Sequence, residues 1–445
     1  MYEDTIAAIS TPVGEGGIGI VRLSGTEARA IAEKLFDHKL SDRRLVYGHI
    51  VDPENGGVVD EVLVVYMKSP KTYTREDVVE INSHGGAAPL QRVLELVLES
   101  GARLANPGEF TLRAFLNGRI DLAQAESVLD VIRAKTEASL RLAVSGLKGR
   151  LSGELKEVRG ELMSVLAYLT ARIDFPEDEV EAQDVEKPLE QCQETFDRLI
   201  ASADTGIAYR QGVRTAIVGR ANVGKSSLLN LLLREDRAIV TEVPGTTRDT
   251  VEEVVNIKGV PFVLIDTAGI VHSKDVVESL GIERSRRAIE MADFVLLVID
   301  RSESLTHYDE EIIDLLAGKT VLTVANKSDL RQKADMDGIR WPVVATSALI
   351  GKGLHTLEDM MVEAVLGGKV ISSDATLVTN PRHKALLKKA YDNLAQALKS
   401  VKGGMPEDFV SIDITAALNT LGQITGDTVT EELLDTIFSQ FCIGK

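Results

Sequence analysis

The sequence predicts a multidomain α/β protein in which a parallel sheet with helices on both faces is inserted into an all-α domain, and an α+β domain precedes both. The chain has 445 residues, too many for one ordinary core. Apolar strands alternate with helices over 212–370, whereas helical periodicity occupies 119–211 and 371–445. Since helical sequence flanks 212–370 on both sides, we expect an insertion.

The first 118 residues mix short β-rich runs with Gly and Pro turns, which is typical of an α+β domain. The runs IGIVRL, VLVVYM and DVVEI predict strands, and a helix is expected near 88–100. In the helical segment that follows, apolar residues spaced by four and three predict one buried stripe on a long helix: Leu151, Leu155, Val158, Leu162, Val165, Leu169 and Ile173. Asp174-Phe175-Pro176 is expected to end that helix.

Composition excludes several classes of protein. The formal net charge of −18 argues against holding nucleic acid by bulk phosphate neutralisation, so an RNA substrate would need a local basic patch or a basic partner. Cys192 and Cys442 are the two cysteines, which excludes a disulfide scaffold and suits a reducing cytosol. With no run of 18 apolar residues and no basic region in Met1–Ser10, we expect a cytoplasmic protein with no membrane segment.

The segment Gly219–Ser226 fits the pattern GxxxxGK[ST]. An ordinary Gly-rich turn is the alternative, but the segment follows the strand TAIVG and opens the helix SSLLNLLL, as a phosphate-binding loop requires. Backbone N–H groups would then surround the phosphates, with Lys225 neutralising charge and Ser226 binding Mg²⁺. The phosphate contacts are expected from Asn222, Val223, Gly224, Lys225, Ser226 and Ser227.

Three further motifs follow in order at predicted strand ends. Asp266-Thr267-Ala268-Gly269 can hold Mg²⁺ through water and sense the γ-phosphate. In Asn326-Lys327-Ser328-Asp329, a carboxylate can accept hydrogen bonds from guanine N1 and N2, and Ser347-Ala348 can offer a backbone N–H to guanine O6. This order is similar to that of translation-factor-like P-loop GTPases. The sequence therefore predicts a protein that binds and hydrolyses GTP.

The region between these motifs carries a switch-like segment, Gly245–Asp249, whose threonines can complete a Mg²⁺ shell. A mobile Gly/Thr turn is a compatible alternative. Directly after the Asp266–Gly269 motif, Ras-like enzymes place a Gln that orients the attacking water. Here Ile270 occupies that position and cannot form a hydrogen bond, so another group must orient the water.

Three weaker signals do not support the function that each motif first suggests. Gly14–Gly19 matches GxGxxG, but a strand is expected after it, which argues against dinucleotide binding. A lone His84 beside a Gly turn is expected to be structural. The ending Cys-Ile-Gly-Lys does not suit prenylation, so Cys442 is either a buried packing residue or a functional thiol.

Four longer segments carry a resemblance over essentially the whole chain: TIAAISTPVGEGGIGIVRLSG, EDVVEINSHGG, NPGEFTLRAFLNGRIDLAQAE and the terminal FCIGK. Together they resemble the MnmE (TrmE) family of tRNA-modification GTPases. The resemblance implies a tetrahydrofolate-binding and dimerisation domain at 1–118, a homodimer, and an FAD-dependent partner of the MnmG type in a heterotetramer. It also implies addition of an aminomethyl or carboxymethylaminomethyl group at C5 of wobble uridine 34 in tRNA.

The resemblance implies site residues as well. Contacts to a 5-formyl- or 5,10-methylene-tetrahydrofolate fall on Arg22, Glu80, Arg119 and Lys445. The K⁺ site falls on Asn222, Thr241, Val243 and Thr246, and the Mg²⁺ ligands on Ser226 and Thr247; Thr241, Thr246 and Thr247 also count among the expected GTP contacts. Glu278 is expected to orient water in place of Ile270. Two positions depart from the family pattern, Ala221 for Pro and Val271 for Arg.

Cys442 is a candidate catalytic residue because it lies three residues before Lys445, and three residues span at most about 10 Å. Two other functions stay open at this point. A ribosome-assembly GTPase would share the nucleotide motifs but would carry an appendage rich in Lys and Arg, which these flanks lack. A non-catalytic nucleotide-dependent switch would differ in measured turnover.

Overall fold

The computed structural model describes residues 4–12, 14–175, 181, 183–235, 253–265, 278–367 and 376–445. They form two compact units. The terminal unit joins residues 4–129 to residues 422–445, and the central unit comprises the described residues between 130 and 421. None of the helices in these ranges is long and apolar enough to cross a lipid bilayer.

The terminal unit is built on a six-stranded sheet with the order β3-β4-β5-β2-β1-β6. Neighbouring strands are antiparallel except for β1 and β6, which pair in parallel. The strands are β1 Ile6–Ile9, β2 Gly16–Ser24, β3 Leu45–Val51, β4 Val58–Met67, β5 Val78–Gly85 and β6 Arg103–Leu104. Because β2 begins inside the Gly14–Gly19 motif, the expected strand is confirmed there and no helix follows the glycines.

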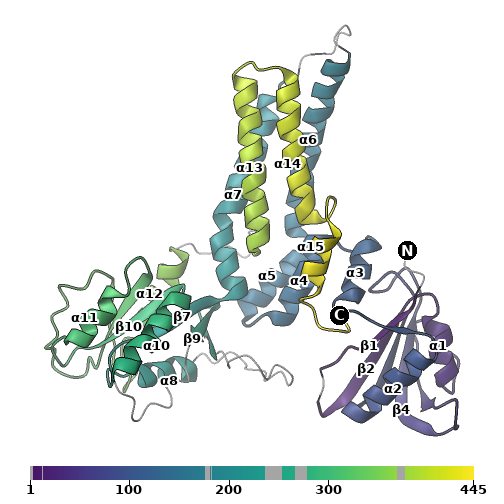
Figure 1. The fold of residues 1–445 in the computed structure, drawn as a ribbon, viewed down its shortest axis with the longest axis horizontal. Coiled ribbons are helices and arrows are strands. Elements are labelled where there is room, and N and C mark those ends of the chain that lie inside the picture. Colours follow the sequence, from purple (N-terminus) through teal and green to yellow (C-terminus); the bar gives the residue numbers. More distant parts are fainter. Residues whose placement is uncertain are drawn as a thin grey trace. The chain divides into compact units, whose positions relative to one another are not determined.

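Helices cover one face of this sheet and add a smaller core beside it. Helices α1 (Ala28–Leu35) and α2 (Ala87–Glu99) lie along the sheet in Figure 1. Their apolar residues are buried in one core cluster with those of the strands. Helix α3 (Glu109–Leu116) packs with α15 (Glu431–Phe438) in a second cluster that includes Ala114, Leu122, Ile437, Phe438 and Phe441. The end of the chain is therefore part of the same core as residues 110–129.

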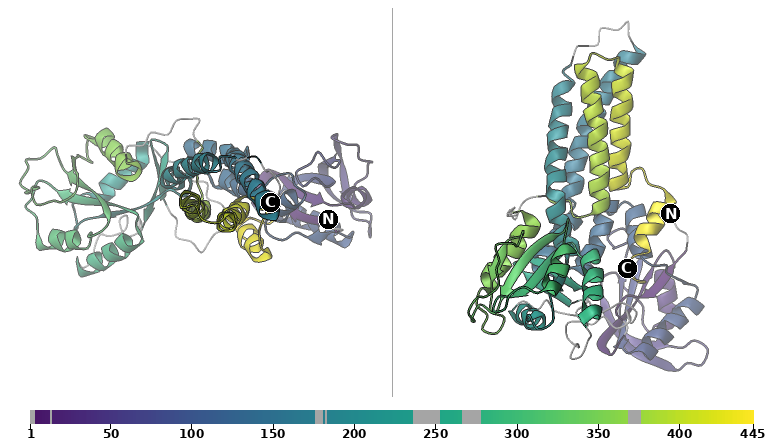
Figure 2. Two further views of the ribbon diagram at one scale, coloured as in Figure 1. Left: turned by 90° about the horizontal axis from the view of Figure 1, so that it is seen from above. Right: turned by 60° about the vertical axis from the view of Figure 1, so that its left-hand side comes forward.

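The helical part of the central unit is a bundle of long helices. Figure 2 shows α6 (Arg150–Asp174) and α7 (Glu186–Gln211) beside α13 (Pro381–Lys402) and α14 (Glu407–Thr425). The predicted stripe on α6 is buried from Leu151 to Leu169, and Tyr168 joins it. Ile173, one residue before the helix ends, is exposed. Two shorter helices, α4 (Leu122–Arg133) and α5 (Glu137–Leu147), precede the bundle.

The second sheet has the order β12-β11-β10-β7-β9-β8. Its strands are β7 Val213–Val218, β8 Glu253–Ile257, β9 Val260–Ile265, β10 Phe294–Asp300, β11 Thr320–Asn326 and β12 Val343–Ala345. One core cluster packs α8 (Lys225–Glu235) and α12 (Leu354–Leu366) against the sheet, and a separate cluster packs α10 (Glu278–Met291) and α11 (His307–Asp314). The predicted parallel sheet with helices on both faces is confirmed, with one difference at its edge.

That difference is β8, which runs antiparallel to β9. The two strands are joined by Lys258 and Gly259, both with positive φ, at 51° and 90°. Two consecutive positive φ values define the hairpin turn whose twist matches paired antiparallel strands. The sequence NIKGV therefore carried a hairpin signal that the alternation of strands and helices concealed.

Candidate functional site

The phosphate-binding loop lies between the end of β7 and the start of α8, as the sequence predicts. Two of its glycines are required by space and by backbone conformation. A Cβ on Gly219 would lie 2.3 Å from the carbonyl oxygen of Val298, and one on Gly224 would lie 2.2 Å from the side-chain nitrogen of Asn326. Gly224 has φ +98° and Asn222 has φ +63°, so the loop turns through positive-φ positions. Turns of this kind form the backbone concavities in which proteins bind anions.

Lys225 lies within this loop. Its Nζ donates hydrogen bonds to the backbone oxygens of Gly219 and Arg220, each at 2.7 Å. Burial lowers the pKa of Lys225 to about 8. Among the described residues its hydrogen-bond partners are these carbonyl oxygens, which carry no full negative charge, and a nucleotide phosphate would supply one. Ser226 and Ser227 follow as the second and third residues of α8.

Asn326 connects the motifs predicted to bind guanine to the phosphate loop. Its Nδ2 donates to the carbonyl oxygen of Val223 at 2.8 Å, and its Oδ1 accepts from the backbone N–H of Ala348 at 3.0 Å. Asp329 accepts a hydrogen bond from the Ser347 hydroxyl at 2.5 Å, which lowers the pKa of the Asp329 carboxyl. One asparagine thus connects three predicted motifs, and Asp329 stays an anionic acceptor.

Lys327 has an anchor that the sequence analysis missed. It has φ +62°, and its Nζ lies 2.6 Å from the Oδ2 of Asp300, a buried residue at the end of β10. The pKa of Asp300 is lowered despite burial, because Lys327 and Ser302 donate to it. A carboxylate ending an otherwise apolar strand was a signal in the sequence, since a buried acid requires a partner.

Arg220 is a second residue that the sequence analysis passed over. Its guanidinium pairs with Glu303 and with the Oδ2 of Asp309, 3.3 Å away. Asp309 also accepts hydrogen bonds from Thr306 at the start of α11. The phosphate loop is therefore attached to the segment after β10, an attachment that sequence spacing does not reveal.

Some predicted residues fall outside the part of the chain that the structure describes: Thr241, Val243, Thr246, Thr247, Asp266, Thr267, Ala268 and Gly269. Glu278 is the first residue of α10, and its side chain also lies outside the described atoms. The described part of the nucleotide site is therefore its phosphate loop and its guanine side.

In the terminal unit, the predicted cofactor residues Arg22 and Glu80 are brought together. They lie opposite each other on β2 and β5, and the guanidinium of Arg22 pairs with the Oε1 of Glu80 at 2.8 Å. Arg22 also lies over the ring of Phe110, 5.8 Å from its centroid, and its Nη1 donates to the carbonyl oxygen of Gly444 at 3.3 Å. An arginine from one end of the chain thus holds the backbone of the other end.

Arg119 has an aromatic support of its own. Its guanidinium lies 4.7 Å from the centroid of the Tyr73 ring, and its Nη1 donates to the Tyr73 carbonyl oxygen at 3.2 Å. The Tyr73 hydroxyl forms a 2.9 Å hydrogen bond with Thr111, and burial raises the pKa of Tyr73. The sequence analysis predicted a role for neither Tyr73 nor Phe110, because a single aromatic residue in a sequence does not indicate which cation it will contact.

The C-terminal tail is fixed by backbone contacts. The backbone N–H of Gly108 donates to the Cys442 carbonyl oxygen at 3.4 Å, and Phe441 is buried. Gly444 has φ +93°, and a Cβ there would lie 2.3 Å from the carbonyl oxygen of Ile9. The Cys442 side chain is exposed, so the buried packing residue is the wrong interpretation of this thiol. Lys445 is half-buried.

His84 has a hydrogen-bonding partner within its own sheet, which agrees with the structural role expected for it. Its Nδ1 lies 2.7 Å from Asp60 on β4, and its ring is largely exposed. Within the described ranges, no group of three or more His, Cys, Asp and Glu side chains is arranged to hold a metal ion. A phosphate loop after one strand, an Asn-Lys-Ser-Asp motif after a second and a Ser-Ala pair after a third, with all three strands parallel in one sheet, define a P-loop GTPase.

Comparison with known proteins narrows this class. The family described as "GTP-binding protein TrmE N-terminus" matches residues 5–119, and the family described as "MnmE helical domain" matches residues 122–442. The chain belongs to the MnmE family of tRNA modification GTPases.

Individual relatives cover the whole chain. The tRNA modification GTPase MnmE of Alkaliphilus oremlandii (strain OhILAs) is 50% identical over 461 residues, covering 100% of both chains. That of Geobacillus thermodenitrificans (strain NG80-2) is 49% identical over 458 residues, covering 99% of each. Among solved structures, the G domain of the T. maritima FeoB iron transporter is 27% identical, covering 34% of this chain and 98% of that one, with a TM-score of 0.26.

Proposed function

We propose that this protein is a K⁺-dependent GTPase, activated when its G domains dimerise, that drives modification of C5 of wobble uridine 34 in tRNA. The one-carbon unit comes from a tetrahydrofolate derivative, and an FAD-dependent flavoprotein of the MnmG type completes a heterotetramer with the homodimer. One observation carries the proposal. A chain of this family has both a candidate guanine-nucleotide site and a second site of cationic side chains, which contacts the C-terminal residues. We place this reaction in the cytoplasm.

The cationic site in the terminal unit suits a folate. Arg22 and Arg119 offer guanidinium groups for the carboxylates of a glutamyl tail, and Glu80 offers an acceptor for the amino and N–H groups of a pterin. Both arginines are already stacked on aromatic rings, so less rotamer freedom is lost when a ligand binds. Lys445 adds a fourth group from the tail.

In the nucleotide site, Ser226 and Thr247 would hold Mg²⁺, which neutralises charge on the β- and γ-phosphates. Asn222, Thr241, Val243 and Thr246 would hold K⁺, whose charge takes the place of an arginine finger. Asn222 suits that role because it lies within the phosphate loop, at a position with left-handed backbone. Glu278 at the start of α10 orients the attacking water, a task that Ile270 cannot perform.

The exposed thiol of Cys442 takes part in transfer of the one-carbon unit. It lies two residues before Gly444, whose carbonyl Arg22 holds, and three before Lys445. The thiol is accessible to a substrate, and a thiol is the kind of nucleophile that can take up and pass on a one-carbon unit. The GTPase site is built from other residues and needs no thiol.

The modified nucleosides of tRNA test the proposal. A strain lacking this protein should lose the C5 modification of uridine 34, and a plasmid with the wild-type gene should restore it. A Lys225→Ala gene, matched in expression, should fail to restore it because the phosphate charge is no longer neutralised. An unchanged nucleoside profile in the deletion strain would contradict the function, whereas restoration by Lys225→Ala would contradict the need for GTP.

A further inference from the structure

We propose that Arg113 is a positioning residue for the cationic site: it fixes the two aromatic rings on which Arg22 and Arg119 lie. The inference rests on the proposed function only in taking a folate as the ligand. Arg113 lies on α3, pairs with Asp4, Glu76 and Glu109, and is not among the residues that the sequence analysis assigned to the site. Arg113 therefore acts on the site through its neighbours.

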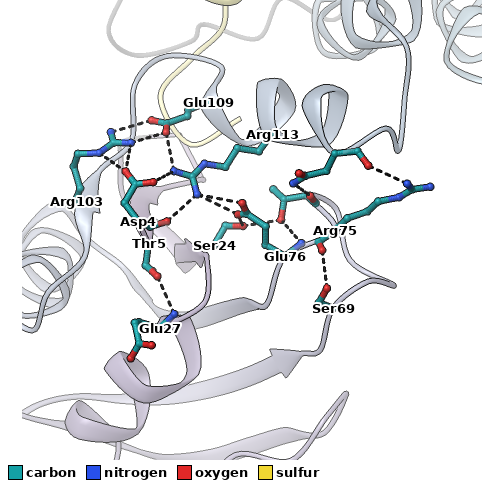
Figure 3. A network of polar contacts seen from close by, with 12 residues as sticks. Asp4, Thr5, Ser24, Glu27, Ser69, Arg75, Glu76, Arg103, Glu109 and Arg113 are labelled. Carbon is teal, nitrogen blue, oxygen red and sulfur yellow. Dashed lines mark hydrogen bonds and ion pairs between the residues drawn. The ribbon is translucent and has the colours of Figure 1, made fainter. Parts of the chain in front are cut away.

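Arg113 is the centre of an ion network that also contains Asp4, Glu76, Arg103 and Glu109, shown in Figure 3; Arg113 and Glu109 are buried, whereas Asp4 and Arg103 reach the surface. Its side chain is 0% exposed. The Nη2 atom donates to the Oδ1 of Asp4 at 2.7 Å and to the Oε1 of Glu109 at 3.0 Å, and Nη1 lies 3.2 Å from the Oε2 of Glu76. Arg103 pairs with Asp4 and Glu109 from the outer side.

The three carboxylates come from three different parts of the unit. Asp4 precedes β1, Glu76 precedes β5 and Glu109 begins α3. A guanidinium is planar and offers its donors in a fixed fork, so one arginine can set the mutual orientation of several acceptors. Arg113 consequently fixes α3 relative to the start of β1 and to the segment that enters β5.

Two of the three attached segments, α3 and the segment with Glu76, lead to the aromatic rings. Helix α3 carries Phe110, which is fully buried under Arg22, and Thr111, which holds the Tyr73 hydroxyl at 2.9 Å. Glu76 accepts a hydrogen bond from Ser24 at 2.8 Å, and the Ser24 hydroxyl in turn lies 2.6 Å from that of Thr74. The chain next to Tyr73 is thus held from one side by the Glu76 contacts and from the other by α3.

Two further contacts attach the end of α3 to the same segment. Asn117 donates from Nδ2 to the Thr74 carbonyl oxygen at 2.7 Å, and Arg75 donates from Nη1 to the Asn117 carbonyl oxygen at 2.9 Å. Arg119 follows two residues later and lies on Tyr73. A small rotation of α3 would therefore move Phe110, Tyr73 and Arg119 together.

A buried arginine is poorly explained by stability alone. Replacing a buried ion network with apolar residues of similar volume is often neutral or stabilising, whereas the geometry of the fork is lost. The network also holds three carboxylates against two guanidinium groups, so removal of Arg113 would leave three acids with one counter-charge. A variant that keeps the charge but loses the fork is the informative one.

The test uses Arg113→Lys in the full-length protein, with binding of 5-formyl-tetrahydrofolate measured by calorimetry and GTP turnover measured in parallel. We expect folate affinity to fall about tenfold, the cost of one or two misdirected charge-assisted hydrogen bonds, while kcat for GTP stays unchanged. The matched control is Val93→Ala, which creates a cavity in the core under α2 and lowers the thermal midpoint without touching the network. A general loss of stability would weaken folate binding in both variants.

A second measurement does not depend on folate. Amide hydrogen exchange should rise in Arg113→Lys at residues 72–76 and 109–119 and stay at the wild-type level in α2. If Arg113→Lys proves unstable, Glu76→Gln keeps the shape of the side chain and weakens one pairing, and it should give the same pattern with a smaller loss of affinity. Wild-type folate affinity in a folded variant would overturn the positioning role and leave the proposed function intact. Failure of the wild-type protein itself to bind folate would overturn the proposed ligand, and the exchange pattern would then decide the positioning role alone.

Discussion

The two sheets of this protein assemble their sites in different ways. In the central unit, the described residues of the nucleotide site come from the ends of parallel strands β7, β11 and β12, and Asn326 joins them through backbone groups. In the terminal unit, the candidate folate site joins β2 and β5 to α3 and to the last residues of the chain, with Arg22 and Gly444 separated by 422 positions. The first arrangement follows from the direction of the strands, whereas the second depends on long-range contacts between side chains and backbone.

This difference has a physical cause. Parallel strands bring their carboxyl ends to one edge of the sheet, so loops after successive strands meet there whatever their sequence. An antiparallel sheet sends successive loops to opposite ends, and a site on it must recruit other segments. We expect the nucleotide site to tolerate changes outside its motifs, and the cationic site to be sensitive to changes far away in sequence.

The largest effect expected is that of Cys442→Ser on tRNA modification. The exposed side chain makes no hydrogen bond among the contacts described, so Ser should leave folding, GTP turnover and folate binding unchanged. Modified uridine 34 should nevertheless fall to the level of the deletion strain, as measured by nucleoside mass spectrometry. Cys192 provides the contrast, because it is buried against Val158 and burial raises the pKa of its thiol to about 11.

A thiol-specific reagent should therefore modify Cys442 in the folded protein well before Cys192. Restoration of modified uridine by Cys442→Ser would make the tail a backbone anchor alone, with Lys445 as its chemical contribution.

Asp329→Asn tests the nucleotide site, because it changes one hydrogen-bond acceptor and leaves the backbone in place. An Asn can still accept the hydrogen bond from Ser347. Loss of a charged acceptor for guanine should weaken GTP binding by roughly 10- to 100-fold, corresponding to about 1.5–3 kcal/mol, and should improve binding of xanthosine nucleotides. Fluorescence titration with guanosine and xanthosine nucleotides measures both changes in affinity.

The control for this variant is Asp335→Asn, a substitution in the same domain at a residue that accepts a hydrogen bond from the Asp337 backbone N–H. It should leave base preference unchanged. Undiminished selectivity for GTP in Asp329→Asn would remove Asp329 from the guanine site.

Gly444→Ala tests the long-range assembly directly, because it keeps Cys442 and Lys445 in the sequence. The left-handed backbone and the 2.3 Å approach to the Ile9 oxygen leave no room for a methyl group, so the tail must shift. The strain amounts to about 1–2 kcal/mol, and folate affinity should fall by roughly 5- to 30-fold in calorimetry. Gly404→Ala is the control, since Gly404 also has positive φ but no neighbour within 4 Å of its Cβ.

Both variants therefore carry a strained backbone, but only the first should affect folate. Equal folate affinity in the two would show that the site forms without the tail in place.

The smallest effect concerns pH. The Lys225 ammonium binds phosphate in its protonated form, and burial lowers its pKa to about 8 in the free protein. Below that value the charge is already present. Above it a proton must be taken up on binding, so GTP affinity should decline as pH rises, by at most about tenfold per unit.

Titrations one unit above and one unit below pH 8 measure this slope. Lys225→Arg keeps its charge over the whole range and should show a flatter dependence, whatever its absolute affinity. A wild-type slope as flat as that of the variant would mean that Lys225 stays charged when the loop is empty.

The sequence by itself determined much of the fold and the nucleotide site. Apolar residues spaced by four and three placed the α6 stripe, and short apolar runs alternating with helices placed strands of the second sheet, since local propensity and burial agree there. The motif at Gly219–Ser226 lies where the strand and helix signals predicted it. The antiparallel β8 was missed because its hairpin signal is two residues long.

Only the tertiary structure decided what surrounds those motifs. That Asp300 anchors Lys327, that Arg22 holds the Gly444 carbonyl, and that Arg113 joins three segments are contacts between positions with no spacing rule. The reason is physical: sequence periodicity reports which face of an element is buried, whereas the partner of a buried charge is chosen by packing in three dimensions. Arg113 itself looks in the sequence like an ordinary helical arginine, and its complete burial became visible only with α3 packed against the sheet.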